Sequence, residues 1–301
     1  MKRLIVTADD FGAAPEVNAA VEAAHREGIL TAASLMVAAP AAADAIARAR
    51  RLPGLHVGLH LTLLEGRPLL PAAAVPHLVD GAGNFPRNPV ALGARLVYSR
   101  AARTELAAEI KAQLAAFSDS GLTLDHCNAH LHFHLHPLIG PLIVALGAHF
   151  GLRAVRVPLE PLAVLRRIEP LGWSAPAALT VPFAQALRRR LAASGLLVAD
   201  RTFGLRWSGH MTPARLAGLI HHLPDGVSEI YLHPATGPYP GAARGYQYAE
   251  ELRALTAAEV AAACRERAVR LGGFADFVSP AAAPPARATI PAQVRRPGAH
   301  A

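Results

Sequence analysis

The chain has 301 residues, of which 52% are hydrophobic and 17% are charged, and these values fit one large globular domain or two small ones. Its formal net charge is +8, from 30 Lys and Arg against 22 Asp and Glu. Aromatic residues make up only 5% of the chain, too few beside the arginine clusters to build base-stacking platforms. We therefore expect no nucleic-acid partner.

The cysteines and the apolar segments indicate where in the cell the protein works. The two cysteines, Cys127 and Cys264, lie at no ligand-like spacing, as expected in a reducing cytoplasm. The N-terminus has no apolar core typical of a signal peptide. The longest nearly uncharged run, residues 28–43, is broken by Pro40 and is too short to span a bilayer. We expect a cytoplasmic protein of unspecified oligomeric state, with arginine-rich stretches suited to peripheral contact with the inner face of the membrane.

Strand-like apolar runs alternate with helix-like amphipathic runs. In chain order, we expect strand 4–6, helix 15–27, strand 33–37, helix 41–51, strand 55–61, a Pro- and Gly-rich excursion over 65–89, helix 104–117, strand 122–130, helix 137–150, strand 153–157, helix 185–193, helix 212–222, strand 229–233 and helix 256–270. This alternation predicts an α/β fold with a mainly parallel sheet. We expect residues 1–280 to form a single domain and the Ala/Pro-rich residues 281–301 to form a disordered tail.

Acidic and imidazole side chains follow several predicted strands at the point where each strand ends. Asp9 and Asp10 end the first strand, and His60, His130 and His233 end three others. The C-terminal ends of parallel strands converge on the functional face of α/β folds. The sequence therefore predicts that these five side chains gather at one site.

Asp9 and Asp10 can serve one site only if the strand ends there, because adjacent side chains of an extended chain point to opposite faces. The following Phe11 and Gly12 can supply the turn. Two neighbouring carboxylates repel each other, so they need a cation or a shared proton. One division of roles is a metal ligand beside a general base. The alternative is a helix N-cap next to an exposed acid.

The run from Asn128 to His136 alternates polar and apolar residues. An extended chain would place Asn128, His130, His132, His134 and His136 on one face, with about 6.6–6.8 Å between neighbours. Metal–nitrogen bonds measure about 2.0–2.1 Å, so we expect one metal ligand from this run. The other histidines would lie near the substrate or behind the ligands. The alternative is a His-rich surface loop, which the alternating Leu and Phe residues oppose.

His60 alone would be interpreted as a buried core histidine. Together with Asp10 and His130, it completes a set of one carboxylate and two imidazoles, which suits zinc and also iron, cobalt or manganese. The sequence has no GxSxG elbow, no P-loop and no GxGxxG after the first strand. A metal-dependent hydrolase is therefore the function that these residues predict.

Four segments resemble, in order, the motifs of YdjC-type carbohydrate deacetylases. They are TADDFG at 7–12, GLHL at 58–61, NAHLHFH at 128–134 and HPA at 233–235. The resemblance covers residues 1–280 and implies a single catalytic domain. It also implies a (β/α) barrel-like fold, a distorted TIM barrel shared with other polysaccharide deacetylases.

Position by position, the resemblance implies that Asp10, His60 and His130 bind one divalent cation, zinc or magnesium. It makes Asp9 the catalytic base, and His233 matches a late His-Pro motif whose histidine is a candidate acid.

The resemblance and the alternating run together place Asn128, His132 and His134 beside the substrate or behind the ligands. Many family members have Asp where Asn128 stands. An amide cannot carry that charge, but it can still orient a ligand.

Four further segments are similar to the hopanoid-biosynthesis-associated, HpnK-like branch of the family, namely 15–37, 51–61, 65–68 and 228–236. This resemblance implies that the substrate is an amino sugar, the N-acetylglucosaminyl head group of a hopanoid lipid. The apolar and basic stretch 159–197, which includes Trp173 and Phe183, fits a lipid-binding surface, and it equally fits an ordinary amphipathic helix that covers the barrel.

Three alternatives to the lipid-linked substrate stay open. The first is a deacetylase of soluble chitooligosaccharides. The second is a metal phosphoesterase, which is disfavoured because no basic residue adjoins the four motifs. The third is a non-catalytic module that binds a carbohydrate or a lipid.

Overall fold

The computed structural model describes residues 1–172 and 175–278 and contains one parallel sheet. Its strands run in the order β4-β3-β2-β1-β6-β5, and β7 pairs with the first part of β1. The sheet curls into a partial barrel, so the α/β, barrel-like prediction is confirmed. The strands are β1 (Lys2–Phe11), β2 (Ala32–Leu35), β3 (His56–Leu61), β4 (Cys127–Ala129), β5 (Arg201–Phe203), β6 (Gly226–Leu232) and β7 (Arg270–Leu271).

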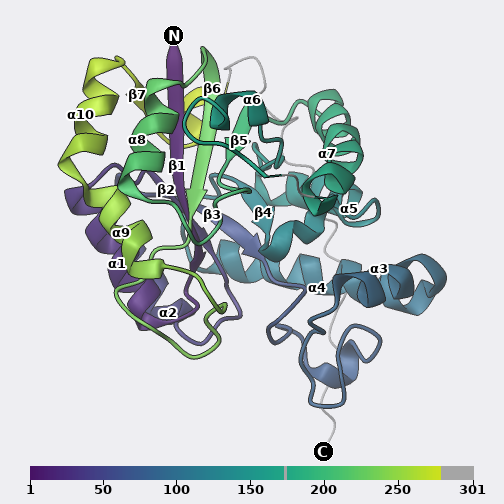
Figure 1. The fold of residues 1–301 in the computed structure, drawn as a ribbon. Helices are drawn as coiled ribbons and strands as arrows, with labels where there is room; N and C mark the ends of the chain where they lie inside the picture. The colour runs from purple at the N-terminus through teal and green to yellow at the C-terminus, as the bar shows by residue number, and fades with distance from the viewer. Residues whose placement is uncertain (173–174, 279–301) are drawn as a thin grey trace, which may run out of the picture.

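Helices surround this sheet (Figure 1). On one side α1 contacts both α2 and α9, while α8 contacts α9 and α10. The helices are α1 (Pro15–Glu27), α2 (Ala42–Ala49), α3 (Pro89–Tyr98), α4 (Arg100–Asp119), α5 (Ile139–Gly147), α6 (Leu162–Leu165), α7 (Ala175–Ala193), α8 (Pro213–His221), α9 (Tyr248–Thr256) and α10 (Ala258–Glu266). Within the described ranges, none of these helices has the length and apolar character needed to cross a membrane.

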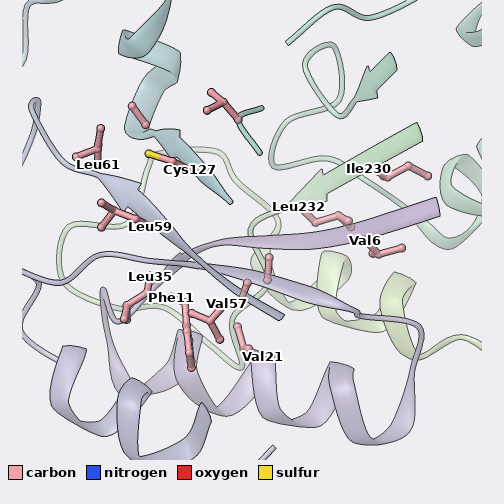
Figure 2. Close-up of a cluster of buried hydrophobic side chains, with 14 of the residues drawn as sticks. Val6, Phe11, Val21, Leu35, Val57, Leu59, Leu61, Cys127, Ile230 and Leu232 are labelled. Carbon is pink, nitrogen blue, oxygen red and sulfur yellow. The ribbon is translucent and has the colours of Figure 1, made fainter. Parts of the chain in front are cut away.

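The core lies on both faces of the central strand. Every residue of β1 from Leu4 onwards is buried, as expected for a parallel strand covered on both sides. Figure 2 shows Phe11 and Val57 directed towards α1, where Val21 meets them. The strand ends that carry the polar residues are therefore held in fixed positions by the packing around β1.

Two predicted strands are shorter than expected. The predicted strand 122–130 is regular only over β4, and the predicted strand 153–157 forms isolated bridges, from Val155 to Cys127 and from Ala154 to Leu197. The backbone hydrogen bonds of residues 153–157 alternate between Cys127 and Leu197. Pro158, which has no N–H to donate, follows this run directly. The run therefore has the position of a strand without a continuous ladder.

The predicted helix 256–270 is also wrong as a single element. Ala257 has extended backbone (ψ 131°), so α9 ends before it and α10 begins after it. The end of the predicted helix turns into β7, which pairs with β1. Helix α3 was not predicted, although Asn88 caps it by accepting from the N–H groups of Val90 and Ala91. The predicted tail, 281–301, lies outside the described residues.

Side chains of α4 hold the excursion that follows β3. The carboxylate of Glu109, fully buried, accepts from the backbone N–H groups of Leu69 and Leu70 at 2.8 and 3.0 Å. The Gln113 amide donates to Glu109 and bonds both backbone groups of Thr62. The excursion is thus tied to the body of the protein through polar groups.

Replacing Glu109 with Ala should destabilise the fold by about 2–5 kcal/mol, because two partly buried N–H groups and the buried Gln113 amide lose their acceptor. Urea unfolding at pH 7 measures the loss. The matched control is Glu105→Ala, one turn earlier on α4, whose carboxylate binds the half-exposed His77 and should contribute about 0–1 kcal/mol. Equal losses for the two variants would contradict this account of the excursion.

Candidate metal centre and active site

The first feature of the site is a backbone turn at the end of β1. Asp10 has a positive φ of 62°, and the register between β1 and β2 shifts between Ala8 and Phe11. The Asn18 side chain holds this turn by accepting from the N–H of Gly12 at 2.8 Å. Because the strand is broken here, both carboxylates line one cavity, as the sequence predicted.

Asp10, His60 and His130 lie together at this strand end. Asp10 Oδ1 lies 3.3 Å from His60 Nε2 and 3.0 Å from His130 Nδ1. All three candidate ligand atoms lie within 4.8 Å of one another. Two imidazoles and one carboxylate converging in this way fit a divalent cation, and the cavity beside them leaves room for water and substrate.

The charges of the trio agree with this fit. Burial alone would raise the pKa of Asp10, but His130 and His60 hold it well below its usual range. Burial alone would lower the pKa of His130, but the Asp10 carboxylate and then Glu65 raise it to about 9. The Asp10 carboxylate therefore stays ionised, and its negative charge favours a positive partner, either a proton on His130 or a metal ion.

Asp9 has a different partner, the guanidinium of Arg156. This fully buried group donates to both Asp9 oxygens, at 2.5 and 2.9 Å. It also donates to the buried Glu229, with Nη2 2.7 Å from Oε1. Burial alone would raise the pKa of Asp9, but Arg156 lowers it below its usual range. Asp9 is therefore an ionised carboxylate facing the cavity.

Arg156 corrects the expectation that no basic residue adjoins the motifs. Its signal in the sequence was a single charge between the apolar Val155 and Val157 in a strand-like run. A charge in such a run needs a buried partner of opposite sign. Glu229, a single charge between Ser228 and Ile230 in the run that forms β6, was also missed as a site residue.

The histidine run is not extended beyond β4. After β4 the chain forms a tight turn (η2, His130–Leu135) in which Leu131 and His132 both have a φ of 53°. His132 Nε2 lies 3.0 Å from the Tyr231 hydroxyl, and His132 lines the cavity. The turn therefore separates histidines that an extended strand would have aligned.

His134 lies behind the cavity. It is fully buried, and its Nε2 lies 2.9 Å from the Arg156 carbonyl. Burial lowers the pKa of His134 to about 3. Asn128, also fully buried, contacts His60 Nδ1 at 2.6 Å. His134 and Asn128 thus lie behind the groups that face the cavity. Of the two expected positions, beside the substrate or behind the ligands, this is the second.

A cavity of about 730 Å³ adjoins the candidate metal ligands. His233 and the tyrosines Tyr239, Tyr246 and Tyr248 form part of its wall. His233 follows β6, and its backbone N–H donates to the buried Glu251 at 2.5 Å. Its ring lies 5.3 Å from that of Tyr246, Tyr246 packs against Tyr248, and Tyr248 packs edge-on against Tyr239. These tyrosines and Glu251 were missed, because nothing in their spacing links them to the strand ends.

Together, the fold and the site define a parallel, barrel-like α/β protein with a candidate metal centre at its C-terminal strand ends. A profile of the family described as YdjC-like protein matches residues 3–266. The chain belongs to this family.

Known relatives match nearly the whole chain. It is 33% identical to a carbohydrate deacetylase of Geobacillus stearothermophilus, over 91% of this chain and 97% of that protein. It is 30% identical to one from Brevibacillus brevis, over 91% and 99%. A crystal structure from Enterococcus faecalis V583, named as a candidate cellobiose-phosphate cleavage protein, superposes with a TM-score of 0.73. That chain is 25% identical, and the match covers 92% of this chain and 99% of that one.

Replacing Arg156 with Met should cost about 3–5 kcal/mol of stability at pH 7, because Asp9 and Glu229 would be left as unpaired buried charges. The loss should shrink as the pH falls towards 4. In the variant Asp9 loses the guanidinium that lowers its pKa, so burial raises that pKa and Asp9 takes up a proton, which reduces the penalty, whereas the wild-type Asp9 stays ionised. Urea unfolding at pH 7 and pH 4.5 measures both values.

The control for this variant is Arg188→Met. Arg188 is partly exposed and lies 3.7 Å from Asp200, so its loss should change stability by at most about 1 kcal/mol at either pH. A cost for Arg156→Met that does not change with pH would show that buried charge is not its cause.

Proposed function

We propose that this protein is a metal-dependent hydrolase that removes the N-acetyl group from an amino sugar, with residues 1–280 as one catalytic domain. The proposal rests on the different surroundings of two adjacent carboxylates. Asp10 lies with two imidazoles in a possible metal site, whereas Asp9 is paired with Arg156 and faces the same cavity. The carbohydrate deacetylases to which the chain is similar support the substrate class.

Asp10, His60 and His130 would hold one divalent cation, zinc or magnesium. Two imidazole ligands favour zinc, because magnesium prefers oxygen ligands and retains several waters. A cation held there would polarise the acetyl carbonyl and lower the pKa of a bound water.

Two other residues of the cavity carry out the proton transfers. Asp9 accepts the proton of the attacking water, and Arg156 keeps Asp9 ionised and oriented for this role. His233 donates a proton to the nitrogen of the departing amine. His132 and the Tyr231 hydroxyl lie between these groups on the cavity wall and are placed to contact the substrate.

Replacing Asp9 with Asn should reduce turnover by about 10²–10⁴-fold, the contribution typical of a general base, and leave metal content near one equivalent. Asp10→Asn should lose both metal and turnover. Acetate release from N-acetylated amino sugars and elemental analysis of the purified variants measure the two properties. Loss of metal from the Asp9 variant would show that the roles of the two aspartates are wrongly assigned.

For the substrate, we propose the N-acetylglucosaminyl head group of a hopanoid lipid, bound by a protein that touches the membrane surface. The cavity is bordered by apolar side chains from three elements, and Val90, Leu131 and Phe183 remain 78%, 52% and 48% exposed. An exposed apolar rim of this kind suits an apolar aglycone better than a free sugar. Arg190 and Phe183 also line a smaller adjoining cavity, so positive charge lies near this rim. Trp173 lies outside the described residues.

The double variant Val90→Ser/Phe183→Ser should lower kcat/KM on the glycosylated hopanoid at least about tenfold, since full burial of one such side chain contributes about 1.5–3 kcal/mol. Its kcat/KM on a soluble chitooligosaccharide should stay unchanged. Leu162→Ser, on α6 and outside the cavity, is the matched control. Equal loss on both substrates, or wild-type activity on the lipid, would remove the lipid assignment and leave the soluble sugar.

Two other functions have less support. A phosphoesterase would use Arg or Lys to clamp the phosphate. Arg156 is already paired with two carboxylates, and Arg206 is the only Arg or Lys among the described residues that line the cavity. A screen with p-nitrophenyl phosphate tests that function. A non-catalytic binding module would bind the glycolipid with metal present and release no acetate.

A further inference from the structure

Exposed apolar side chains gather on two helices of this protein. In the part of the chain that the structure describes, ten large apolar side chains are exposed, and six of them belong to α3 or α7. These six are between 39% and 88% exposed and are Val90, Val97 and Tyr98 on α3 and Leu179, Val181 and Phe183 on α7. Such side chains are ordinary when they are scattered singly, whereas a cluster of them marks a surface that meets a partner.

Helix α3 is apolar on both of its faces. Its inner face is buried against the body of the protein through Leu92, Gly93 and Leu96. Its exposed residues carry a single charge, that of Arg95, and are Pro89, Val90, Ala91, Ala94, Arg95, Val97 and Tyr98. A surface helix normally turns polar residues to water, and a helix that is apolar all round is normally covered on both sides. The outer face of α3 is therefore suited to a second partner.

Both ends of α3 are held by hydrogen bonds, so its exposed face is a fixed feature of the surface. Asn88 caps the first turn, and the guanidinium of Arg103 donates to the carbonyls of Leu96 and Val97 in the last turn, at 3.1 and 2.8 Å. Val90 and Val97 lie two turns apart, which makes the apolar face about 10 Å long.

Both helices border the cavity of the candidate active site. Val90 of α3 and Phe183 of α7 line the cavity, and so does the exposed Leu131. Figure 1 shows α3 and α7 on the same side of the molecule, with α1 and α10 on the other side. A partner that covers these two helices would therefore lie against the apolar rim of the cavity.

The charges around the two helices have one sign. Residues 81–104 contain four Arg and no Asp or Glu, and residues 170–199 contain three Arg and no Asp or Glu. By contrast, α1, α9 and α10 each contain at least two glutamates. Five of the seven arginines are exposed, namely Arg87, Arg95, Arg100, Arg189 and Arg190. The apolar surface thus lies among positive charges, which complement an anionic surface.

A lipid bilayer fits this combination better than the other possible partners. A second copy of the chain would bring the arginines of one protomer against those of the other. A nucleic acid would need aromatic side chains beside the arginines, but the exposed residues of α3 and α7 are mainly aliphatic. A bilayer takes up aliphatic side chains below its head groups, and anionic head groups attract arginine.

We propose that α3 and residues 179–183 of α7 form a docking surface for an anionic lipid bilayer, which places the rim of the cavity at the lipid head groups. As a means of reaching a lipid-linked sugar, this surface rests on the proposed function. Val97 and Tyr98 enter the bilayer interface, and Arg87 and Arg100 contact the anionic head groups.

The test is binding of the full chain to vesicles, measured by flotation. One set of vesicles is pure phosphatidylcholine, and the other is an equal mixture of phosphatidylcholine and phosphatidylglycerol. The apolar variant is Val97→Ser/Tyr98→Ser, because neither residue lines the cavity, and the charge variant is Arg87→Gln/Arg100→Gln. Leu162→Ser, on α6, controls for the loss of an exposed apolar side chain elsewhere.

The wild type should bind the mixed vesicles more tightly than the neutral ones. The apolar variant should weaken binding to the mixed vesicles at least about tenfold, because two apolar side chains are lost from the interface. The charge variant should weaken the same binding about fivefold for each arginine removed. Leu162→Ser should bind as the wild type does, and all variants should keep the wild-type kcat/KM on a soluble chitooligosaccharide.

A wild type that binds neither kind of vesicle, or an apolar variant that binds as the wild type does, overturns the docking surface. A dimer in solution that the apolar variant dissociates, without vesicle binding, assigns α3 to a second copy and also overturns it. Vesicle binding by a protein that releases no acetate from any N-acetylated sugar leaves the surface intact and contradicts the proposed function. Acetate release by a protein that ignores vesicles has the opposite meaning.

Discussion

The buried guanidinium of Arg156 is the interaction on which the site depends, because it joins three separate parts of the chain. It pairs with Asp9 at the end of β1 and with Glu229 on β6, and its own backbone bonds Cys127 on β4. One cation between two carboxylates leaves a net negative charge on side chains that are at most 2% exposed. Such a cluster is stable only while each member keeps its partners, so the geometry of the strand ends and their charges are fixed together.

This constraint explains how two adjacent aspartates acquire different roles. The turn at Asp10 separates the two side chains, and each then meets cations of a different kind. Asp10 meets histidines, which can lose a proton and bind a metal ion, whereas Asp9 meets an arginine, which cannot. The difference between a proposed ligand and a proposed base thus lies in their neighbours, since the two residues are chemically identical.

The sequence predicted the parts of the fold and site that repeat a simple pattern. Parallel alternation and the strand-end positions of Asp10, His60 and His130 follow from periodicity, and the structure brings these three together. The bent histidine run was not predictable, because the left-handed residues Leu131 and His132 have no sequence signal comparable to glycine. Arg156 pairs with residues 147 and 73 positions away, and contacts at such separations arise only from the tertiary fold.

The proposed function depends on which side chains hold the cation. A crystal structure of zinc-loaded protein, with an anomalous difference map at the zinc edge, tests this assignment most directly. We expect one zinc ion bound by Asp10, His60 and His130, with ligand distances of about 2.0–2.2 Å, and with Asp9 still paired to Arg156. A zinc ion bound by Asp9, or located away from these three residues, would contradict it.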